Sequence, residues 1–504
     1  MALSVALIMP ADAATASALA DWTEYRVKLR QPTTQGRLKN TSDTVPAVVP
    51  AARGVDGAAE PRASSGADVC VLSASHISCS PPLVFIKPRA QPAPHTDSEA
   101  SSRKCVPELT CFSSYAPPPA SGRQTGLWKE VEPELLEKYG YPCQEHIVET
   151  EDGYILRMFR IPYGKASPLV PGERKPAVLV QHGLMNSADD WVIMGPNASL
   201  AYILADKGYD VWLGNIRGNW YSQRHRTLSP EEDKYWRFSW HEHGIYDMPA
   251  QIDYVLNATG HKQIYYIGHS MGTTMFYVGM SMKPEYNEKI RAMFSLAPIA
   301  YMNHMISPLF QLLAKFTTSA QVLLYLIGAS KFTPSQELIR LIQPKICNDK
   351  SVTEPICTNV VFMICGFDKE QVVEEKLAAI SAHIPAGSST RQFVHYAQGI
   401  DKGHFRQFDH GIVENIKRYK QPTPPDYKLI NVKAPVYLFY SLNDWLAGPQ
   451  DIDRLYTQLG NAKRKFKVAY EKFNHLDFTY GKDAYDLVYK QVLDLMHKYE
   501  QGDL

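Results

Sequence analysis

One stretch decides the fold that the sequence predicts: Ile264-Tyr265-Tyr266-Ile267-Gly268-His269-Ser270-Met271-Gly272-Thr273-Thr274. A short β-branched and aromatic run stops at Gly-x-Ser-x-Gly and continues in residues that favour a helix, which predicts a strand, a sharp turn and a helix. Glycines at 268 and 272 let the strand and the helix approach closely, and the turn holds Ser270 in a strained backbone conformation. The pattern therefore predicts a nucleophile elbow, in which the Ser270 hydroxyl is lifted clear of the end of a strand.

Composition excludes several classes of partner. The chain has 504 residues, with 53 Lys and Arg against 52 Asp and Glu, so no basic excess is available for a nucleic acid. No window has the roughly 18 uninterrupted apolar residues of a membrane span, and Lys315 breaks the richest window, Leu309–Ala329. The eight cysteines lack the paired Cys-x-x-Cys spacing of a zinc site. We expect no metal, no cofactor, no nucleic acid and no transmembrane span.

The first 125 residues differ in composition from the rest. They are rich in Ala, Pro, Ser, Thr and Gly and have few periodic apolar positions, so residues 1–125 are predicted to be a disordered N-terminal extension. An apolar run, Ala2–Met9, lacks a preceding basic segment and predicts at most a weak signal peptide. Aromatic content rises from Trp128 onward, where we place the domain boundary.

From residue 126 to about 300 strand patterns alternate with helix patterns. A hairpin is predicted around Glu151-Asp152-Gly153, and a continuous apolar run, Ala177–Val180, is typical of a buried parallel strand. Residues 428–504 resume this alternation. The further predicted strands are Tyr209–Leu213, Ala292–Leu296, Ala434–Tyr440 and Lys465–Tyr470, and the predicted helices are Leu127–Tyr139, Ser199–Lys207, Asp247–Ala258, Gln450–Leu459 and Ala484–Lys498. The alternation predicts an α/β fold with a mainly parallel central sheet.

Between residues 301 and 427 the alternation stops. Helical apolar runs, Ile306–Phe316 and Val322–Leu326, precede three cysteines and a proline-rich exit, Gln421–Pro425. This pattern predicts a helical insertion within the α/β core.

Functional groups in a parallel sheet collect at the carboxyl ends of its strands. Asp444 follows the predicted strand that ends at Tyr440, and His475 follows the last predicted strand. The order Ser270, Asp444, His475 is the nucleophile, acid and base order of α/β-hydrolases. In this hypothesis His475 takes the proton from Ser270 and Asp444 orients the imidazole and stabilises its cation.

Alternatives to these residues remain at the sequence level. Asp477 and Asp451 are weaker candidates for the acid, and the other histidines near helices or in the insertion are less well placed: His241, His243, His395, His404 and His410. The oxyanion hole is expected to use two backbone N–H groups, those of Met271 after the nucleophile and Leu184 after an earlier strand. His182, just before Leu184, is expected to be a hydrogen-bonded structural residue.

The chain resembles the acid lipases, which include gastric and lysosomal acid lipases and many insect lipases. The resemblance covers about Trp128–Tyr499 and rests on motifs that include Thr150-Glu151-Asp152-Gly153-Tyr154, Gln181-His182-Gly183-Leu184, Gly208-Tyr209-Asp210-Val211-Trp212-Leu213-Gly214-Asn215, Gly268-His269-Ser270-Met271-Gly272, Asn443-Asp444-Trp445-Leu446-Ala447 and Asn474-His475-Leu476-Asp477-Phe478. It implies an α/β-hydrolase fold whose insertion at residues 301–427 is a cap and lid. It also implies a disulfide between Cys347 and Cys357, with Cys365 free.

The resemblance implies a hydrolase that cleaves triacylglycerols or cholesteryl esters with a Ser270, Asp444 and His475 triad, in lipid degradation. A lid that covers an apolar crevice would make transient contact with a lipid droplet or membrane surface. Secretion or lysosomal delivery is the family expectation, and Asn197 and Asn257 are then possible N-glycosylation sites, as is Asn40.

Two other functions compete with this one. A non-catalytic lipid-binding protein on the same fold is one alternative, although such relatives typically lose the nucleophile or the base. A carboxylesterase for small esters is the other, and the large insertion weighs against it. The sequence leaves open the acyl-chain and alcohol preference, the pH optimum and the oligomeric state.

Overall fold

The structure, a computed structural model, describes residues 132–317, 320–335, 338, 359–366 and 368–504. All of these lie in the second of two compact units, Ser101–Leu504. The predicted N-terminal extension and the first residues of the predicted helix 127–139 lie outside the described residues. The remainder of that helix is α2, Glu132–Lys138.

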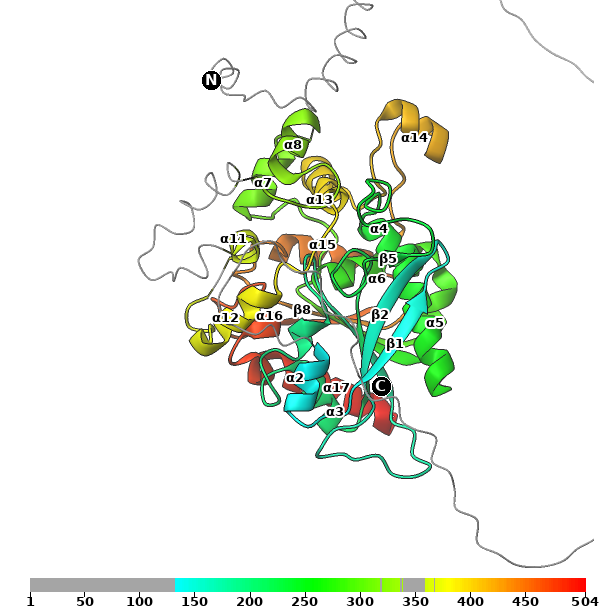
Figure 1. Cartoon of the computed structure of the whole chain (residues 1–504), viewed down its shortest axis with the longest axis vertical. Helices are drawn as coiled ribbons and strands as arrows, with labels where there is room; N and C mark the ends of the chain where they lie inside the picture. The colour runs from blue at the N-terminus through cyan, green and yellow to red at the C-terminus, as the bar shows by residue number, and fades with distance from the viewer. Residues whose placement is uncertain (1–131, 318–319, 336–337, 339–358, 367) are drawn as a thin grey trace, which may run out of the picture. The chain divides into compact units, whose positions relative to one another are not determined.

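Nine strands of the described residues form one mixed sheet, which confirms the predicted fold class (Figure 1). The order is β1-β2-β4-β3-β6-β7-β8-β9, with β5 beside β2, and all pairs from β4 to β9 in this order are parallel. The predicted hairpin is the antiparallel pair β1 and β2. The strands are β1 Gln144–Glu149, β2 Tyr154–Ile161, β3 Ala177–Gln181, β4 Asp210–Gly214, β5 Arg224–His225, β6 Ile264–His269, β7 Ile290–Leu296, β8 Val436–Tyr440 and β9 Ala462–Lys467.

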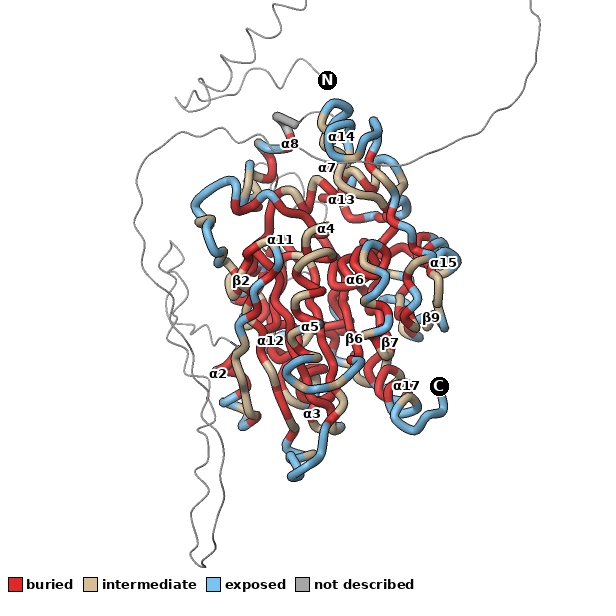
Figure 2. Tube along the Cα trace, turned by 90° about the vertical axis from the view of Figure 1, so that its right-hand side faces the viewer, coloured by how far each residue is buried: buried red, intermediate tan, exposed pale blue. Residues whose placement is uncertain are grey.

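The parallel strands are buried on both faces, as their continuous apolar sequences require. Along β6, Ile264 and Tyr266 join one hydrophobic core, while Tyr265 and Ile267 join the other. Figure 2 shows the buried (red) trace of β6 and β7. The sheet therefore separates two cores and fixes the strand ends from which the candidate site is built.

Helices cover both faces of the sheet. One core takes side chains from α2, α3 and α17, and the other from α5, α6 and α15. The helical segments outside the insertion are η1 Ala188–Trp191, α3 Leu200–Asp206, α4 Trp240–Glu242, η2 His243–Asp247, α5 Met248–Thr259, α6 Met271–Met282, η3 Pro284–Lys289, η4 Leu429–Asn431, α15 Pro449–Gln458, α16 Asp477–Tyr480, η5 Tyr485–Tyr489 and α17 Lys490–Gln501.

No strand of the sheet comes from the described residues between β7 and β8. This segment carries α7 Pro308–Ala314, α8 Ala320–Ile327, α11 Val360–Cys365, α12 Glu374–His383, α13 Thr390–Lys402 and α14 Ile412–Tyr419. Buried side chains of α7, α11 and α13 join the same core as α5 and α6. In Figure 1 α7, α8, α13 and α14 lie together at the top, and α3 and α17 lie at the bottom.

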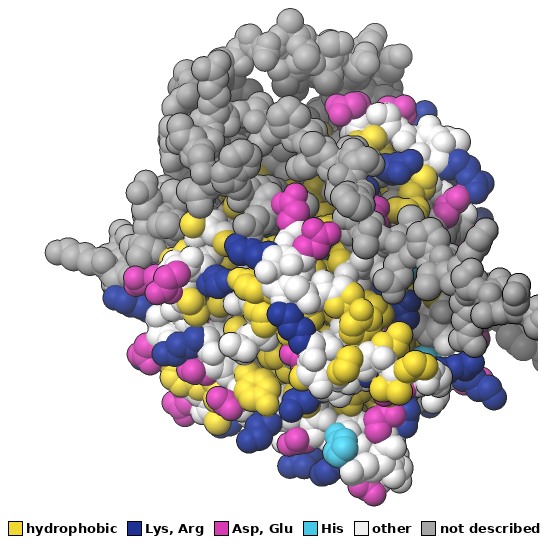
Figure 3. All heavy atoms as spheres, turned by 60° about the horizontal axis from the view of Figure 1, so that its bottom comes forward, with side chains coloured by type: hydrophobic (Ala, Val, Ile, Leu, Met, Phe, Trp, Pro, Cys, Tyr) yellow, Lys and Arg dark blue, Asp and Glu magenta, His cyan; other side chains and the backbone are white. Residues whose placement is uncertain are grey.

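The surface carries charges of both signs. On the face shown in Figure 3, lysine and arginine side chains are interspersed with aspartate and glutamate. This distribution agrees with the formal net charge of +1. Within the described residues, every helix is too short or too polar to cross a bilayer.

Candidate active site

Ser270 occupies the turn between β6 and α6. Its φ of 55° and ψ of −120° lie in a region that non-glycine residues rarely adopt, which is the strain expected of a nucleophile elbow. The backbone N–H of Ser270 donates to the carbonyl of Leu296 at 3.0 Å, and the Thr273 hydroxyl donates to the carbonyl of Ser270 at 2.6 Å. These bonds hold the strained turn between two neighbouring strand ends and the first turn of α6.

The two glycines of the motif are required by close backbone packing. A Cβ at Gly272 would lie 2.5 Å from the carbonyl oxygen of Gln181, at the end of β3. A Cβ at Gly268 would lie 2.9 Å from the carbonyl of Gly272. Since real Cβ atoms do not approach backbone this closely, any side chain at either position would push α6 away from the sheet.

Asp444 and His475 lie side by side in the structure. Asp444 follows β8, and its two carboxylate oxygens accept from His475 Nδ1 at 2.8 and 3.0 Å. One of these oxygens also accepts from the backbone N–H groups of Leu446 and Ala447, both at 2.8 Å. Because Nδ1 carries the proton of this bond, Nε2 of a neutral His475 has a free lone pair and can act as a base.

Electrostatics favour the ionised form of Asp444. Burial alone would raise the pKa of this carboxyl, but the charge and hydrogen bond of His475 and the two backbone N–H groups together hold the pKa below its usual value. An ionised Asp444 is the form that stabilises a histidine cation.

The rival acids have other partners. Asp477 accepts from the backbone N–H of Asn474 at 2.6 Å, and Asp451 accepts from the backbone and the ring of His304 at 2.8 and 2.9 Å. Neither carboxylate bonds to His475. Burial, followed by the neighbouring Asp368 and Asp444, raises the pKa of Asp477 well above its usual value despite that backbone bond, so its surroundings favour the neutral form.

The rival histidines are also occupied elsewhere. His243 bonds to Asp247, His241 bonds to the hydroxyl of Tyr427, and His395 stacks on Trp240 with its ring centroid 3.6 Å away. His404 faces Asp426, and His410 packs against Phe408. None of these rings lines the cavity that contains Ser270.

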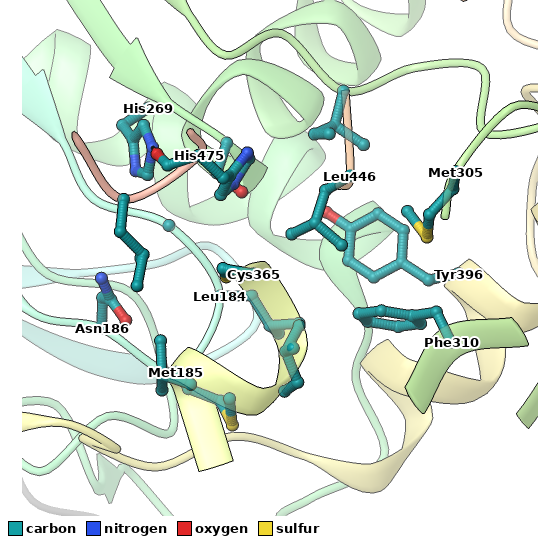
Figure 4. A pocket seen from close by; sticks show the side chains of 16 residues that line it. Leu184, Met185, Asn186, His269, Met305, Phe310, Cys365, Tyr396, Leu446 and His475 are labelled. Carbon is teal, nitrogen blue, oxygen red and sulfur yellow. Dashed lines mark hydrogen bonds between the residues drawn. The ribbon is translucent and has the colours of Figure 1, made fainter. Parts of the chain in front are cut away.

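A cavity of about 30 Å³ brings Ser270 and His475 together with Leu184 (Figure 4). Its other walls are mostly apolar, with Asn186 and His269 as polar exceptions, and about half of them come from the segment between β7 and β8, among them Met305, Phe310 and Tyr396. Within the part of the chain that the structure describes, His475 Nε2 is buried and has no hydrogen-bond partner. The base is therefore free to accept a proton from a group in this cavity.

The loop after β3 approaches Ser270 closely. A Cβ at Gly183 would lie 3.1 Å from the Cβ of Ser270 and 3.5 Å from its hydroxyl oxygen. Leu184, the next residue, lines the cavity, and Met271 is the first residue of α6. Leu184 thus lies in the cavity of the nucleophile and Met271 directly follows it, and their role as an oxyanion hole stays a prediction.

His182 and His269 are buried next to the site and form hydrogen bonds with its backbone. His182 Nδ1 donates to the carbonyl of Gly183 at 2.8 Å, and its Nε2 accepts from Asn219 at 3.2 Å, so both ring nitrogens are hydrogen-bonded, and its structural role stays a prediction. His269 Nε2 donates to the carbonyl of His475 at 2.9 Å. Burial lowers the pKa of both rings to about 3, which keeps them neutral beside the base.

A polar cluster beside the cavity was not found from the sequence. Asn186 lines the cavity and donates to Asp190 at 2.6 Å, and the hydroxyl of Tyr480 donates to the same carboxylate at 2.5 Å. Burial raises the pKa of Asp190 to about 7, although these two bonds oppose the shift. Asp190 and Tyr480 are 290 positions apart, and neither belongs to a recognisable motif.

The remaining predicted residues are placed as follows. Asn197 and Asn257 are both exposed, as glycosylation sites must be, and glycosylation itself stays a prediction. Cys365 is a buried free cysteine on α11 that lines the cavity. The predicted Cys347–Cys357 disulfide and Asn40 lie outside the described residues.

Comparison with known proteins assigns the family. Residues 133–195 match the partial α/β-hydrolase lipase region and residues 176–335 match the α/β-hydrolase fold. Lipase 3 of Drosophila melanogaster is 43% identical over 73% of this chain and 93% of its own length. Human lysosomal acid lipase/cholesteryl ester hydrolase is 37% identical over 73% and 90%, and rat gastric triacylglycerol lipase is 38% identical over 72% and 90%. The chain therefore belongs to the acid lipase family of α/β-hydrolases and is a carboxylic ester hydrolase.

Proposed function

We propose that this protein is a serine lipase that hydrolyses the ester bonds of neutral lipids, triacylglycerols or cholesteryl esters, through a Ser270, His475 and Asp444 triad. One observation carries the proposal. His475 is oriented by Asp444 through Nδ1, its Nε2 has no partner among the described residues, and its ring lines the same cavity as the strained Ser270. The substrate classes are those named in two relatives, a gastric triacylglycerol lipase and a lysosomal acid lipase/cholesteryl ester hydrolase.

In this mechanism the Ser270 hydroxyl attacks the ester carbonyl while His475 Nε2 takes its proton. The backbone N–H groups of Leu184 and Met271 stabilise the tetrahedral oxyanion. The proton on His475 then passes to the leaving alcohol, and an acyl-enzyme remains on Ser270. A water molecule then attacks the acyl-enzyme while His475 takes its proton, and His475 returns this proton to the Ser270 oxygen as the fatty acid leaves.

The small cavity supports the proposal that the segment 301–427 includes a cap and lid. A volume of about 30 Å³ is far below the roughly 300–1,000 Å³ of ligand pockets, so a lipid acyl chain does not fit. Ser270 is buried, and the apolar wall contains Phe310 of α7 and Tyr396 of α13. Movement of these helices at a lipid surface would open the site.

The cellular setting is part of the same proposal. Two of the relatives are named lysosomal and gastric lipases, and we propose that this chain is likewise secreted or lysosomal and acts in lipid degradation. The exposure of Asn197 and Asn257 is compatible with glycosylation on that route.

The test compares wild type with Ser270→Ala on triolein, cholesteryl oleate and a soluble short-chain ester. We expect wild type to hydrolyse at least one long-chain ester and Ser270→Ala to lose about 10⁴-fold or more of kcat on all three. Equal turnover by both proteins would refute the triad, and wild-type activity on the short-chain ester alone would support a small-ester carboxylesterase instead. Lipid binding without turnover by either protein would support the non-catalytic alternative.

A further inference from the structure

Helix α14, Ile412–Tyr419, has an apolar face that the described residues leave uncovered. The exposed fractions of Ile412, Val413 and Ile416 are 66%, 71% and 49%. With about 3.6 residues per turn, positions 412, 413 and 416 lie on one side of a helix. Of the eight residues of α14 only Asn415 is buried, and the exposed (pale blue) helix lies at the top of Figures 1 and 2.

Polar contacts, rather than this apolar face, attach α14 to the protein. Asn415 accepts from the backbone N–H of His410 at 2.9 Å and donates to Asp409 at 2.7 Å and to the carbonyl of Pro422 at 3.0 Å. The Tyr419 hydroxyl donates to the carbonyl of Phe408 at 2.9 Å. The three aliphatic side chains belong to neither core of the described residues, which leave them available to another surface.

Basic side chains flank the apolar face. Lys417, Arg418 and Lys420 are exposed, and Glu414 is the single acidic residue between 412 and 420. Glu414 pairs with Arg418 at 2.8 Å and with Lys417 at 3.4 Å, so among the described residues Lys420 has no acidic partner and Lys417 shares one. An apolar face flanked by lysines is typical of helices that lie at the surface of an anionic lipid layer.

The position of α14 relates it to the candidate active site. It follows α13, which supplies Tyr396 to the cavity wall, and lies at the same end of the structure as α7 and α8 (Figures 1 and 2). Another apolar side chain of this end, Leu324 on α8, is 41% exposed. A flat apolar and anionic surface that touches α14 would thus also face the helices that close the cavity.

We infer that α14 is a docking helix that binds an anionic lipid–water surface and brings the cap end of the enzyme to it. The inference rests on the proposed function, in which the ester substrate lies in such a surface. Protein interfaces are built around aromatic and arginine anchors in pockets, but on α14 Arg418 is paired with Glu414 and Tyr419 is bonded to Phe408. The branched aliphatic and lysine side chains that remain fit a lipid layer better than a protein partner.

The experiment measures cosedimentation of the full chain with vesicles of phosphatidylcholine, alone or with about one third phosphatidylglycerol. One variant combines Ile412→Ser, Val413→Ser and Ile416→Ser, and a second combines Lys417→Gln and Lys420→Gln. The matched control combines Leu169→Ser and Val170→Ser, two apolar residues more than half exposed on the loop before β3. That loop leads to the amino end of a parallel strand, away from the carboxyl ends that carry the candidate site.

We expect the triple serine variant to bind anionic vesicles at least about tenfold more weakly than wild type. The lysine variant should weaken binding about tenfold on anionic vesicles and little on neutral ones, and high salt should remove that difference. Hydrolysis of triolein in anionic vesicles should fall in parallel, while kcat/KM for a soluble short-chain ester and the far-UV circular dichroism stay unchanged. The loop control should behave as wild type.

The inference fails if the triple serine variant binds as wild type does, if the loop control loses as much, or if wild type binds no vesicle. Recruitment of wild type by a purified protein partner, without vesicle binding, would likewise overturn it. Ser270→Ala separates the two proposals because it should bind vesicles normally and hydrolyse nothing. If Ser270→Ala stays active, the proposed triad is wrong, and the vesicle measurements still decide the role of α14.

Discussion

At the scale of single residues, Asp444 is the group whose proposed role depends most on its protonation chemistry. Asp444→Asn keeps an oxygen for the N–H groups of Leu446 and Ala447 but can present an amide N–H to His475 Nδ1. The imidazole would then carry its proton on Nε2 and could not accept one from Ser270. We expect kcat on a soluble ester to fall about 10⁴-fold with little change in KM.

Asp477→Asn is the matched control for this prediction. Asp477 is as buried as Asp444 and lies two positions from His475, but its bond is to the backbone of Asn474. Since burial raises the pKa of Asp477 well above its usual value, the neutral asparagine resembles the form that its surroundings favour. If kcat falls as much for Asp477→Asn as for Asp444→Asn, the assignment of Asp444 as the acid of the triad is wrong.

The sequence allowed part of this site to be predicted. Asp444 and His475 could be inferred because each follows a strand pattern whose carboxyl end must reach the same edge as Ser270. Rejecting Asp451 and Asp477 needed coordinates, because only their hydrogen bonds distinguish them from Asp444. The Asn186, Asp190 and Tyr480 cluster could not be predicted, since it forms only when distant segments pack together.

At the scale of elements, the close contact between α6 and the end of β3 requires glycine at position 272, and this requirement can be tested. Gly272→Ala would place a methyl group 2.5 Å from one backbone oxygen and 3.0 Å from the next, and neither atom can move without shifting β3. We expect a loss of about 2–3 kcal/mol in the free energy of unfolding. A shift of the turn of even about 1 Å should also cost about 10²-fold in kcat.

Gly399→Ala on α13 is the comparison for Gly272→Ala. There the nearest atom to the new methyl group is the flexible end of Met302, also at 2.5 Å, and no backbone atom is closer than 3.7 Å. Since alanine favours a helix by roughly 1 kcal/mol over glycine, stability should change little or rise. Denaturant unfolding measures the stability of both variants, and ester turnover measures their activity. Similar losses in the two variants would show that contact with the backbone is not the cause of the loss in Gly272→Ala.

Two elements show where sequence patterns give imprecise boundaries. The predicted strand Lys465–Tyr470 is β9, Ala462–Lys467, because its limits follow its pairing with β8 rather than its own apolar positions. The predicted helix Ala484–Lys498 begins with the π-helical turn η5. This wider turn shifts the helical face, so Val488 and Tyr489 are buried and Leu487, expected inside with Val492 and Leu495, is only half-buried.

At the scale of the whole molecule, three buried carboxyl groups give the stability a predictable pH dependence. The pKa of Asp444 is lowered by its partners, so its contribution is present above the unfolded pKa of about 3.9 and is lost only as pH falls further. Burial raises the pKa values of Asp190 and Asp477. Their contributions to the free energy of unfolding are therefore complete below about pH 3.9, the pKa of an unfolded Asp, and are lost as pH rises. The three groups together favour the folded state at mildly acidic pH.

Asp190 determines the pH range over which stability declines, because burial raises its pKa to about 7 in the folded protein and the unfolded carboxyl titrates near 3.9. Stability should therefore decline as pH rises from about 4 to about 7, and Tm of wild type should fall by roughly 3–5 °C over this range from Asp190 alone.

Asp190→Asn removes the titration of this carboxyl group. The Oδ1 of Asn186, which has no partner among the described residues, can turn to accept from the new amide while Tyr480 still donates to its oxygen. Tm of Asp190→Asn should thus vary less with pH than that of wild type, and Asp503→Asn at the exposed C-terminus should follow wild type. Scanning calorimetry across this range measures the slopes, and an unchanged slope for Asp190→Asn would mean that this carboxyl stays ionised in the folded protein.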